Sequence, residues 1–364
     1  MSINRLYNTW IQTVGQLLPG ERVTRVRNLT WLIIGVFLSR SVRLDRIALK
    51  IPGPAKETSL TRRLSRFLSN PALSARPIYE PIARCWLRHL AESQKGLTLI
   101  IDGTRVGFGY HMLLVAVAYR RRALPIAWVW IRAKTGHSPL QAQLALLEYV
   151  HRLLPEAIPI TLVGDSEFRA LELFFQLERW GWKYVLRMIE TYQVRWTDEE
   201  PWQNAGALVS APGSQAWCPG ILLTIKHAYR TNVLAYWQAG EKQAWLLATN
   251  LDQAKPTLQA YRRRMWVEEM FGDWKGHGFD FQQTHLRDPD RLSRLTLAVI
   301  LLYLWLIFGG LRVIKNGKRH FVDRHDRRDL SLFQIGLRWF ERCVKNDIAF
   351  IVSLTLPAWI LSGS

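Results

Sequence analysis

The sequence predicts an α/β protein built on a mixed β-sheet, with a β-strand insertion and with helical regions at both ends. Three observations support this fold class. Within residues 96–188, apolar runs typical of strands first form a hairpin pattern and then alternate with helical segments, as in a mixed sheet. Residues 189–250 break that alternation with short β-like runs. Residues 1–95 and 276–364 show helical patterns instead.

The N-terminal helical region, residues 1–95, is basic. One short segment in it, "SLTRRLSRFLSNP", is predicted to form a helix that ends at Asn70-Pro71 and carries Arg62, Arg63 and Arg66. A short basic helix that follows another helix suits a DNA-binding unit. A solvated helix face has the same composition, so both interpretations stay open.

The strand pattern begins at about residue 96. "LTLIID" is a short apolar run that ends in Asp102, and "HMLLVAVAY" and "ALPIAWVWI" are predicted to form a hairpin around "RRR". Ser138-Pro139 opens an amphipathic helix, with the serine as N-cap. "IPITLVGD" is a further strand that ends in an acid, Asp165. The helix in "FRALELFFQLERWG" closes at Gly181, and "WKYVLRM" is the next strand.

The remaining chain completes this organisation. Residues 189–250 hold runs such as "ILLTIKHAY", "TNVLAYW" and "AWLLATNL", and we predict a β insertion within the α/β unit. That unit comprises residues 96–188 before the insertion and residues 251–312, which return to helix, after it. Residues 313–364 are predicted to be a basic, helical C-terminal region.

One uncharged apolar stretch, residues 295–311, approaches the length of a membrane span. It is shorter than the roughly 20 residues that a spanning helix needs. Arginines bracket it on both sides, and no other segment of the chain resembles a span. We therefore predict a buried core helix.

The charge of the chain indicates a polyanionic partner. Its 49 Lys and Arg exceed its 29 Asp and Glu, which gives a formal net charge of +20 and a pI near 10.3. Nucleic acid fits this charge, and so does an anionic membrane surface. The three cysteines are far apart in the sequence and form no C-x-x-C pair, which argues against a disulfide framework or a zinc site and is typical of a reducing cytoplasm.

Two acids at predicted strand ends suggest a metal site. Asp102 and Asp165 each follow an apolar run of the same predicted sheet. Either acid alone is commonly a turn or capping residue. Together, two such carboxylates can bind a shared divalent cation such as Mg²⁺, which prefers oxygen ligands and supports phosphodiester cleavage. A third carboxylate from elsewhere in the chain would complete the site.

The helical segment "YRRRMWVEEMFGDWK" offers two adjacent glutamates for that role. At ~100° per residue, one continuous helix places four side chains within an arc of about 60°: Tyr261, Arg264, Glu268 and Lys275. A carboxylate flanked by cations suits a metal site that also binds phosphate. The same spacing fits an ordinary ion pair between Arg264 and Glu268, and both interpretations stay open.

The other faces of this helix are assigned in the same way. The predicted core stripe consists of four apolar residues, Val267, Met270, Phe271 and Trp274. Glu269 falls on a different face, near Arg262 and Asp273, which we expect to be a solvated polar edge. Glu268 is therefore the glutamate of chemical interest. Glu167, two residues after Asp165, is either a further ligand or the start of the next helix.

The spacing Tyr261-x2-Arg264-x3-Glu268-x6-Lys275 resembles, without a gap, the signature of the insertion sequence four type of DDE transposases. "IIDGT" and "LVGDSEF" resemble the surroundings of that family's first two aspartates. The resemblance spans roughly residues 95–310. It implies a ribonuclease-H-like fold in which Asp102, Asp165 and Glu268 ligate two Mg²⁺ or Mn²⁺ ions.

The same resemblance implies a cut-and-paste DNA transposase that cleaves the ends of its element and joins the freed 3′-hydroxyls to target DNA. Tyr261, Arg264 and Lys275 would hold phosphates near the cut. "WLLATN" resembles a family stretch whose tryptophan stacks on a flipped base, which makes Trp245 the candidate here. A tryptophan packed in a strand of the core is the alternative.

The N-terminal residues 1–95, with Arg62, Arg63 and Arg66, would bind the element's ends. Family members act as homodimers on DNA, so we expect a cytoplasmic, nucleoid-associated dimer. Many relatives have a tryptophan directly after the motif arginine; here Met265 follows it, and Trp266 comes next. A stand-alone nuclease and a catalytically silent DNA-binding derivative are the alternative functions.

Overall fold

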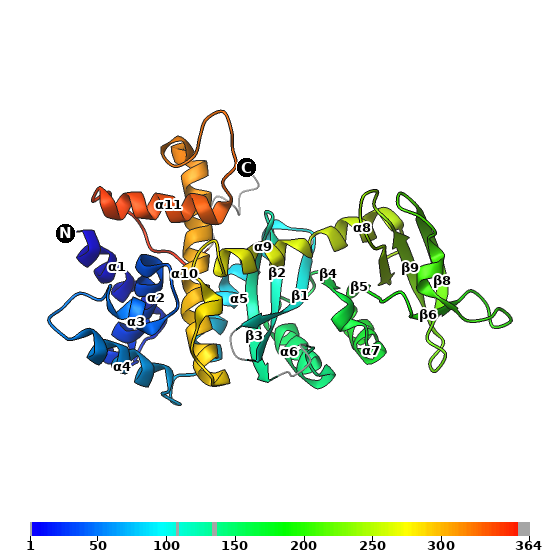
Figure 1. Cartoon of the computed structure of the whole chain (residues 1–364), viewed down its shortest axis with the longest axis horizontal. Helices are drawn as coiled ribbons and strands as arrows, with labels where there is room; N and C mark the ends of the chain where they lie inside the picture. Colours follow the sequence, from blue (N-terminus) through cyan, green and yellow to red (C-terminus); the bar gives the residue numbers. More distant parts are fainter. Residues whose placement is uncertain (1, 107–108, 133–136, 356–364) are drawn as a thin grey trace.

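The computed structural model describes residues 2–106, 109–132 and 137–355, and a single ten-stranded sheet runs through most of it (Figure 1). From one edge to the other, the strands are β3 (Arg122–Arg132), β2 (Tyr110–Tyr119), β1 (Leu97–Val106), β4 (Ile160–Gly164), β5 (Lys183–Arg187), β10 (Trp245–Thr249), β9 (Tyr229–Tyr236), β8 (Gln215–Leu223), β6 (Gln193–Arg195) and β7 (Gln203–Asn204).

The first five strands form a ribonuclease-H-like sheet. β1, β2 and β3 make an antiparallel meander, whereas β4 is parallel to β1 and β5 is parallel to β4. The order β3-β2-β1-β4-β5 places the first strand at the centre, beside the strand that ends before Asp165. The predicted mixed sheet is confirmed, and with it the fold class.

The apolar runs become strands because both faces of the sheet are covered. β2 is buried along its whole length, as continuous rather than alternating hydrophobicity indicates. The hairpin predicted around "RRR" is present, and Tyr119 pairs with Arg122 across a two-residue turn. Its central residues, Arg120 and Arg121, have φ values of 46° and 62°, a conformation that usually requires glycine or asparagine.

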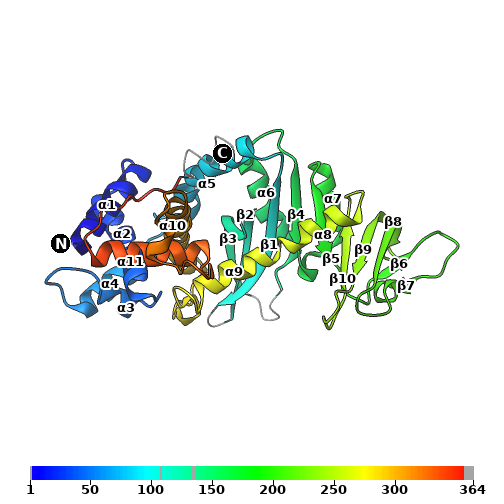
Figure 2. The same ribbon diagram turned by 90° about the horizontal axis from the view of Figure 1, so that it is seen from above.

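Helices pack on both faces of the sheet (Figure 2). On one face lie α6 (Leu140–Leu153) and α7 (Leu171–Arg179), and α7 is followed by Gly181 in the left-handed conformation, as predicted. α8 (Ala254–Arg262) and α9 (Met265–Trp274) cross the other face, from the insertion towards β3.

The remaining helices form a bundle beside the sheet. Its members are α1 (Ser2–Leu17), α2 (Val23–Ser39), α3 (Leu44–Ala48), α4 (Glu57–Leu68), α5 (Ala75–Ser93), α10 (Pro289–Lys315) and α11 (Leu332–Lys345). The apolar α10 lies at its centre, where Trp305 contacts Trp10 of α1 and stacks on Phe340 of α11. The N- and C-terminal regions therefore share one core.

α10 contains the apolar stretch 295–311. The helix is long and apolar enough to cross a membrane, but 89% of its most apolar window is buried inside the protein. The prediction of a core helix is confirmed.

The insertion extends the same sheet instead of forming a separate layer. β10 pairs with β5 in antiparallel register, Leu247 opposite Arg187, and β9, β8, β6 and β7 follow outwards. This arrangement places Trp245, the first residue of β10, against Tyr261 at the end of α8. The described residues also contain four short 3₁₀ helices: Ser166–Phe168, Ala205–Leu208, Phe281–Gln283 and Lys318–Phe321. The domain boundaries at 95, 188, 250 and 312 stay predictions.

Candidate active site

Asp102 and Asp165 lie on neighbouring central strands. β1 and β4 are parallel, and their register pairs Ile101 with Gly164, so the next residue along each chain is one of the two aspartates. Asp165 directly follows β4, as predicted. Asp102 was expected to end its strand, and it does not. β1 stays paired with β2 beyond this residue, and Asp102 itself lies opposite Leu114. The sheet nevertheless brings both carboxylates to one place.

The carboxyl group of Asp102 is deeply buried, with 5% of the residue exposed. Its Oδ1 accepts a hydrogen bond of 2.7 Å from the backbone N–H of Gly103. Burial raises the pKa of Asp102 to about 7; the Arg264 guanidinium opposes this shift, and the charges of Asp165 and Glu268 add to it. The positive charge of Arg264 therefore does not fully offset the cost of burying an ionised Asp102.

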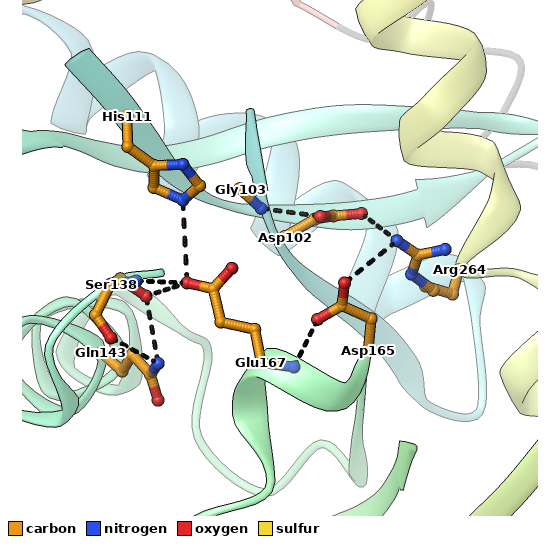
Figure 3. Close-up of polar contacts among 8 residues, drawn as sticks. All are labelled: Asp102, Gly103, His111, Ser138, Gln143, Asp165, Glu167 and Arg264. Atoms are coloured by element: carbon orange, nitrogen blue, oxygen red, sulfur yellow. Dashed lines mark hydrogen bonds and ion pairs between the residues drawn. The ribbon is translucent and has the colours of Figure 1, made fainter. Parts of the chain in front are cut away.

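Arg264 contacts all three predicted catalytic acids (Figure 3 shows the two aspartates). Its Nη2 lies 2.9 Å from Asp102 Oδ2 and 3.6 Å from Asp165 Oδ2, and its Nη1 donates to Glu268 Oε1 at 2.6 Å. The Arg264–Glu268 ion pair that spacing alone allowed is present. The same guanidinium also reaches the aspartates, so Glu268 belongs to the acid cluster.

The helix that carries these residues is broken, which corrects the prediction of one continuous helix. α8 ends at Arg262 and α9 begins at Met265, and the turn between them uses i→i−3 bonds such as Arg264 N–H to the Tyr261 carbonyl at 2.8 Å. The turn directs two successive arginines to β1: Arg263 Nη1 donates to Thr98 Oγ1 at 2.6 Å, and Arg264 bonds to the acids.

Tyr261 precedes the break, at the end of α8, but stays near the acids. It is 1% exposed, and its ring packs edge-on against Trp245 of β10, with 5.1 Å between centroids. Burial raises the pKa of Tyr261 to about 12, and the charges of Arg264, Asp165 and Asp102 also act on its hydroxyl. Lys275, directly after α9, donates from Nζ to Thr104 Oγ1 of β1 at 2.7 Å, and burial lowers its pKa against the opposing charge of Asp102. Arg264, Glu268 and Lys275 therefore face β1, and Tyr261 lies near the same acids with its ring against Trp245.

The other faces of α9 match the sequence prediction except at one position. The expected core stripe is buried: Val267, Met270, Phe271 and Trp274. Glu269 is exposed, as expected. Asp273 was expected at a solvated edge and is instead buried, with its Oδ2 3.3 Å from Arg122 Nε of β3. Burial raises the pKa of Asp273 to about 7, although Arg122 opposes the shift.

Glu167 is turned away from the acid cluster (Figure 3). Its Oε1 accepts from the Ser138 backbone N–H at 2.6 Å and from the Ser138 hydroxyl, and it lies 3.7 Å from His111 Nε2. Ser138 was predicted to cap the following helix; Pro139 occupies that position instead, because the serine is engaged by Glu167. His111 and Ser138 are neighbours of the site that sequence reasoning missed, and no spacing signal marked them.

The predicted end-binding arginines lie on α4, in the helical bundle and apart from the acids (Figure 1). Arg62 and Arg66 are exposed. Arg63 is engaged within the protein: its Nε donates to Asn28 Oδ1 at 2.9 Å, and its guanidinium lies 4.4 Å from the centroid of the Trp31 ring. Two of the three side chains are thus available at the surface.

The acid cluster fits a divalent cation in charge and in donor type. Three carboxylates face one guanidinium, which leaves negative charge uncompensated, and carboxylate oxygens are the ligands that Mg²⁺ and Mn²⁺ prefer. As they stand, no three acidic, histidine or cysteine side chains in the described residues converge closely enough to hold an ion. In this arrangement the Arg264 guanidinium, and not a metal ion, contacts each of the three carboxylates.

More than half of the chain matches a known protein family. The family model described as "Transposase DDE domain" matches residues 93–305. Among solved structures, the piggyBac transposase in a synaptic complex with hairpin DNA aligns over 96% of this chain and 82% of its own, with 11% identity and a TM-score of 0.46. Overlap at this level is too loose to support an argument. No curated protein matches the chain.

Proposed function

The chain belongs to the transposase DDE domain family, and we propose that it is a cut-and-paste transposase of the insertion sequence four type. Membership makes it a DNA transposase, an enzyme that cleaves DNA and transfers strands with the help of divalent metal ions. The finer assignment is supported by the spacing from Tyr261 to Lys275 and by the position of the β insertion between β5 and the helix that carries Glu268.

We assign catalysis to Asp102, Asp165 and Glu268, which would hold two Mg²⁺ ions, with Mn²⁺ as a substitute. The observation that carries this assignment is the contact of one guanidinium with all three carboxylates, which come from β1, the end of β4 and α9. When bound, the ions would activate the attacking oxygen and stabilise the leaving oxygen of the phosphodiester.

Two positively charged side chains of the site would then bind the phosphate of the DNA. Arg264 would leave the acids and bind a phosphate oxygen, to which its planar guanidinium is suited. Lys275, held by Thr104 at the far end of β1, would add a second positive charge on the same side of α9. The proposed catalytic acids and phosphate-binding side chains would therefore come from β1, the end of β4 and the segment from Arg264 to Lys275.

Trp245 and Tyr261 would act together on a flipped base. Trp245 is half-buried at the start of β10 and covers the ring of Tyr261. A tyrosine–phosphate contact requires the indole to move aside, and stacking on an extruded base near the transposon end would provide that movement. Arg62 and Arg66 of α4 would contact the terminal repeats, and a homodimer would hold the two ends together.

The experiment that tests this function is to incubate the purified chain with the terminal DNA of its own element and Mg²⁺, and to map the cut strands. The proposed function predicts cleavage at the element's ends, followed by joining of the labelled ends to a plasmid. Cleavage without joining would identify a stand-alone nuclease, and metal-dependent nicking at random positions would contradict the assignment to a transposase with defined ends.

A further inference from the structure

A second basic surface lies beside α9, on the flank that faces away from the acids. A cavity of about 590 Å³ lies between the tip of the β2–β3 hairpin, α9 and the segment around residues 314–335. A neighbouring cavity of about 310 Å³ shares Arg120 and Trp266 with it, so the two lie side by side. We call this surface the arginine groove and define it by Arg120, Arg121, Arg263, Arg319, Arg328 and Trp266.

The charge of the arginine groove is strongly positive. Arg120, Arg121, Arg263 and Arg328 are exposed, and Arg319 is half-buried beside Asp323. Two acidic residues are found among the described residues that line it, and each faces a cation: Glu269 lies 3.5 Å from Arg122 Nη1, and Asp329 lies 2.8 Å from Arg327 Nε. A polyanion is the ligand that this distribution attracts.

The hairpin tip holds its two arginines at a conformational cost. Arg120 and Arg121 occupy both central positions of the turn with positive φ, which glycine and asparagine adopt with much less strain. Both residues line the groove together with the half-buried Trp266. Exposed arginines are suited to contact the phosphates of a nucleic-acid backbone.

The groove lies one helix away from the proposed catalytic acids. Along the crossing helix, Arg264 and Glu268 face the acids, whereas their sequence neighbours Arg263 and Glu269 line the groove. A duplex bound in the groove therefore lies beside the short segment that carries Arg264 and Glu268.

We propose that the arginine groove binds the phosphate backbone of the target duplex, the DNA that receives the element. This inference rests on the proposed function, because only a strand-transfer enzyme has a target. Arginine contacts to phosphates position a duplex without selecting its sequence. The element's ends must be recognised by sequence, whereas a target is accepted with many sequences, so a groove that provides charge and little base recognition fits the target.

The test uses the double variant Arg120→Asn, Arg121→Gly in the full chain. Asparagine and glycine suit the turn, so the variant folds at least as stably as the original protein while it loses two groove charges. The matched control is Arg152→Gln, Arg179→Gln, which removes two exposed charges from α6 and α7 on the opposite face of the sheet. Thermal unfolding verifies that both proteins are folded.

Two measurements are made on each protein. The first is binding to a random-sequence duplex without the element's ends, as a function of salt. For the groove variant, the slope of log K against log salt becomes shallower by about two, because each phosphate contact contributes about 0.9. The second is joining of pre-cleaved labelled ends to a plasmid, which falls roughly tenfold or more while end cleavage is retained. The control changes neither.

Three results would overturn the proposal. An unchanged salt slope shows that the groove holds no duplex. Joining at the original rate shows that any duplex held there is not the target. Loss of end binding together with joining shows that the groove holds the transposon end instead. The binding measurement does not require catalysis, so the groove is tested even if the chain proves unable to cleave its ends.

Discussion

The guanidinium of Arg264 lies 2.9 Å from the carboxylate of Asp102, in the position that a bound cation takes among acids. The same group reaches Asp165 and Glu268. One positive charge therefore lies among three carboxylates and does not balance them. Arg264 therefore links the three acids, and the proposed function requires it to move away when metal and DNA bind.

The first prediction concerns Glu268. Glu268→Gln keeps the shape of the side chain but removes its charge, so end cleavage in Mg²⁺ falls roughly a hundredfold to a thousandfold, as expected for loss of a metal ligand. The Glu268 side chain is 49% exposed, so the free energy of unfolding changes by less than about 1 kcal/mol. Timed cleavage of labelled end DNA measures the first effect and chemical denaturation the second.

The control for this substitution is Glu148→Gln, an exposed glutamate on α6 across the sheet. It leaves cleavage unchanged. Cleavage by Glu268→Gln at the rate of the original protein would show that Glu268 only pairs with Arg264.

The second prediction concerns competition between Arg264 and metal ions. Arg264→Gln leaves the acids without their cation, so the free energy of unfolding without metal falls by about 2 kcal/mol. Because the arginine no longer occupies the space between the carboxylates, Mg²⁺ or Mn²⁺ stabilises the variant more than the original protein. Thermal unfolding with and without MgCl₂ compares the two shifts. A smaller shift in the variant would mean that Arg264 helps to bind the metal instead of competing with it.

The third prediction concerns pH and Asp273. Its folded-state pKa, about 7, lies above the ordinary value of 3.8, so between these pH values the folded protein binds a proton that the unfolded chain has lost. This contribution to the free energy of unfolding is fully present below about pH 4 and decreases as the pH rises to about 7. Above that pH it no longer changes. It amounts to at most about 4 kcal/mol.

Asp273→Asn removes this contribution, so its free energy of unfolding falls less steeply between pH 4 and 7 than that of the original protein. Denaturant unfolding at a series of pH values measures the difference. Asp252→Asn, at an exposed position before α8, is the control and leaves the slope unchanged. Identical slopes for Asp273→Asn and the original protein would contradict a raised pKa at this position.

The fourth prediction separates stacking from packing at Trp245. Trp245→Phe retains an aromatic face, whereas Trp245→Leu retains an apolar side chain without one. Base stacking on an aromatic ring contributes about 1–3 kcal/mol, so end cleavage falls about tenfold with leucine and little with phenylalanine. Fluorescence of 2-aminopurine near the transposon end reports the flipped base directly. Equal effects of leucine and phenylalanine would favour a tryptophan that only packs against Tyr261.

The mixed sheet could be predicted from the sequence because apolar runs ending near Asp102 and Asp165 are local patterns. The grouping of Glu268 with these two aspartates came instead from the resemblance to a family signature, because spacing alone also fitted an ordinary Arg264–Glu268 ion pair. The break between α8 and α9 was not predictable, since it arises from contacts of Arg263 and Arg264 with β1, far away in sequence. Periodicity assumes a straight helix and therefore contains no signal for this break.

Asp273 was misplaced for a related reason. An acid on the polar side of a helix is normally solvated, but β3 brings Arg122 against Asp273. Glu167 opens the short helix Ser166–Phe168, in line with the helix-start interpretation, but its side-chain partner Ser138, from the chain before α6, was not expected. Both outcomes depend on which element packs alongside, and spacing within one segment contains no such information.

The most direct test of the central claim is to locate Mn²⁺ by anomalous diffraction in crystals of the protein bound to its end DNA. The account predicts anomalous peaks at the acid cluster, with oxygens of Asp102, Asp165 and Glu268 about 2.1 Å away and Arg264 turned towards a phosphate. Crystals that cleave the DNA while manganese binds elsewhere, with Arg264 still between the three carboxylates, would contradict it.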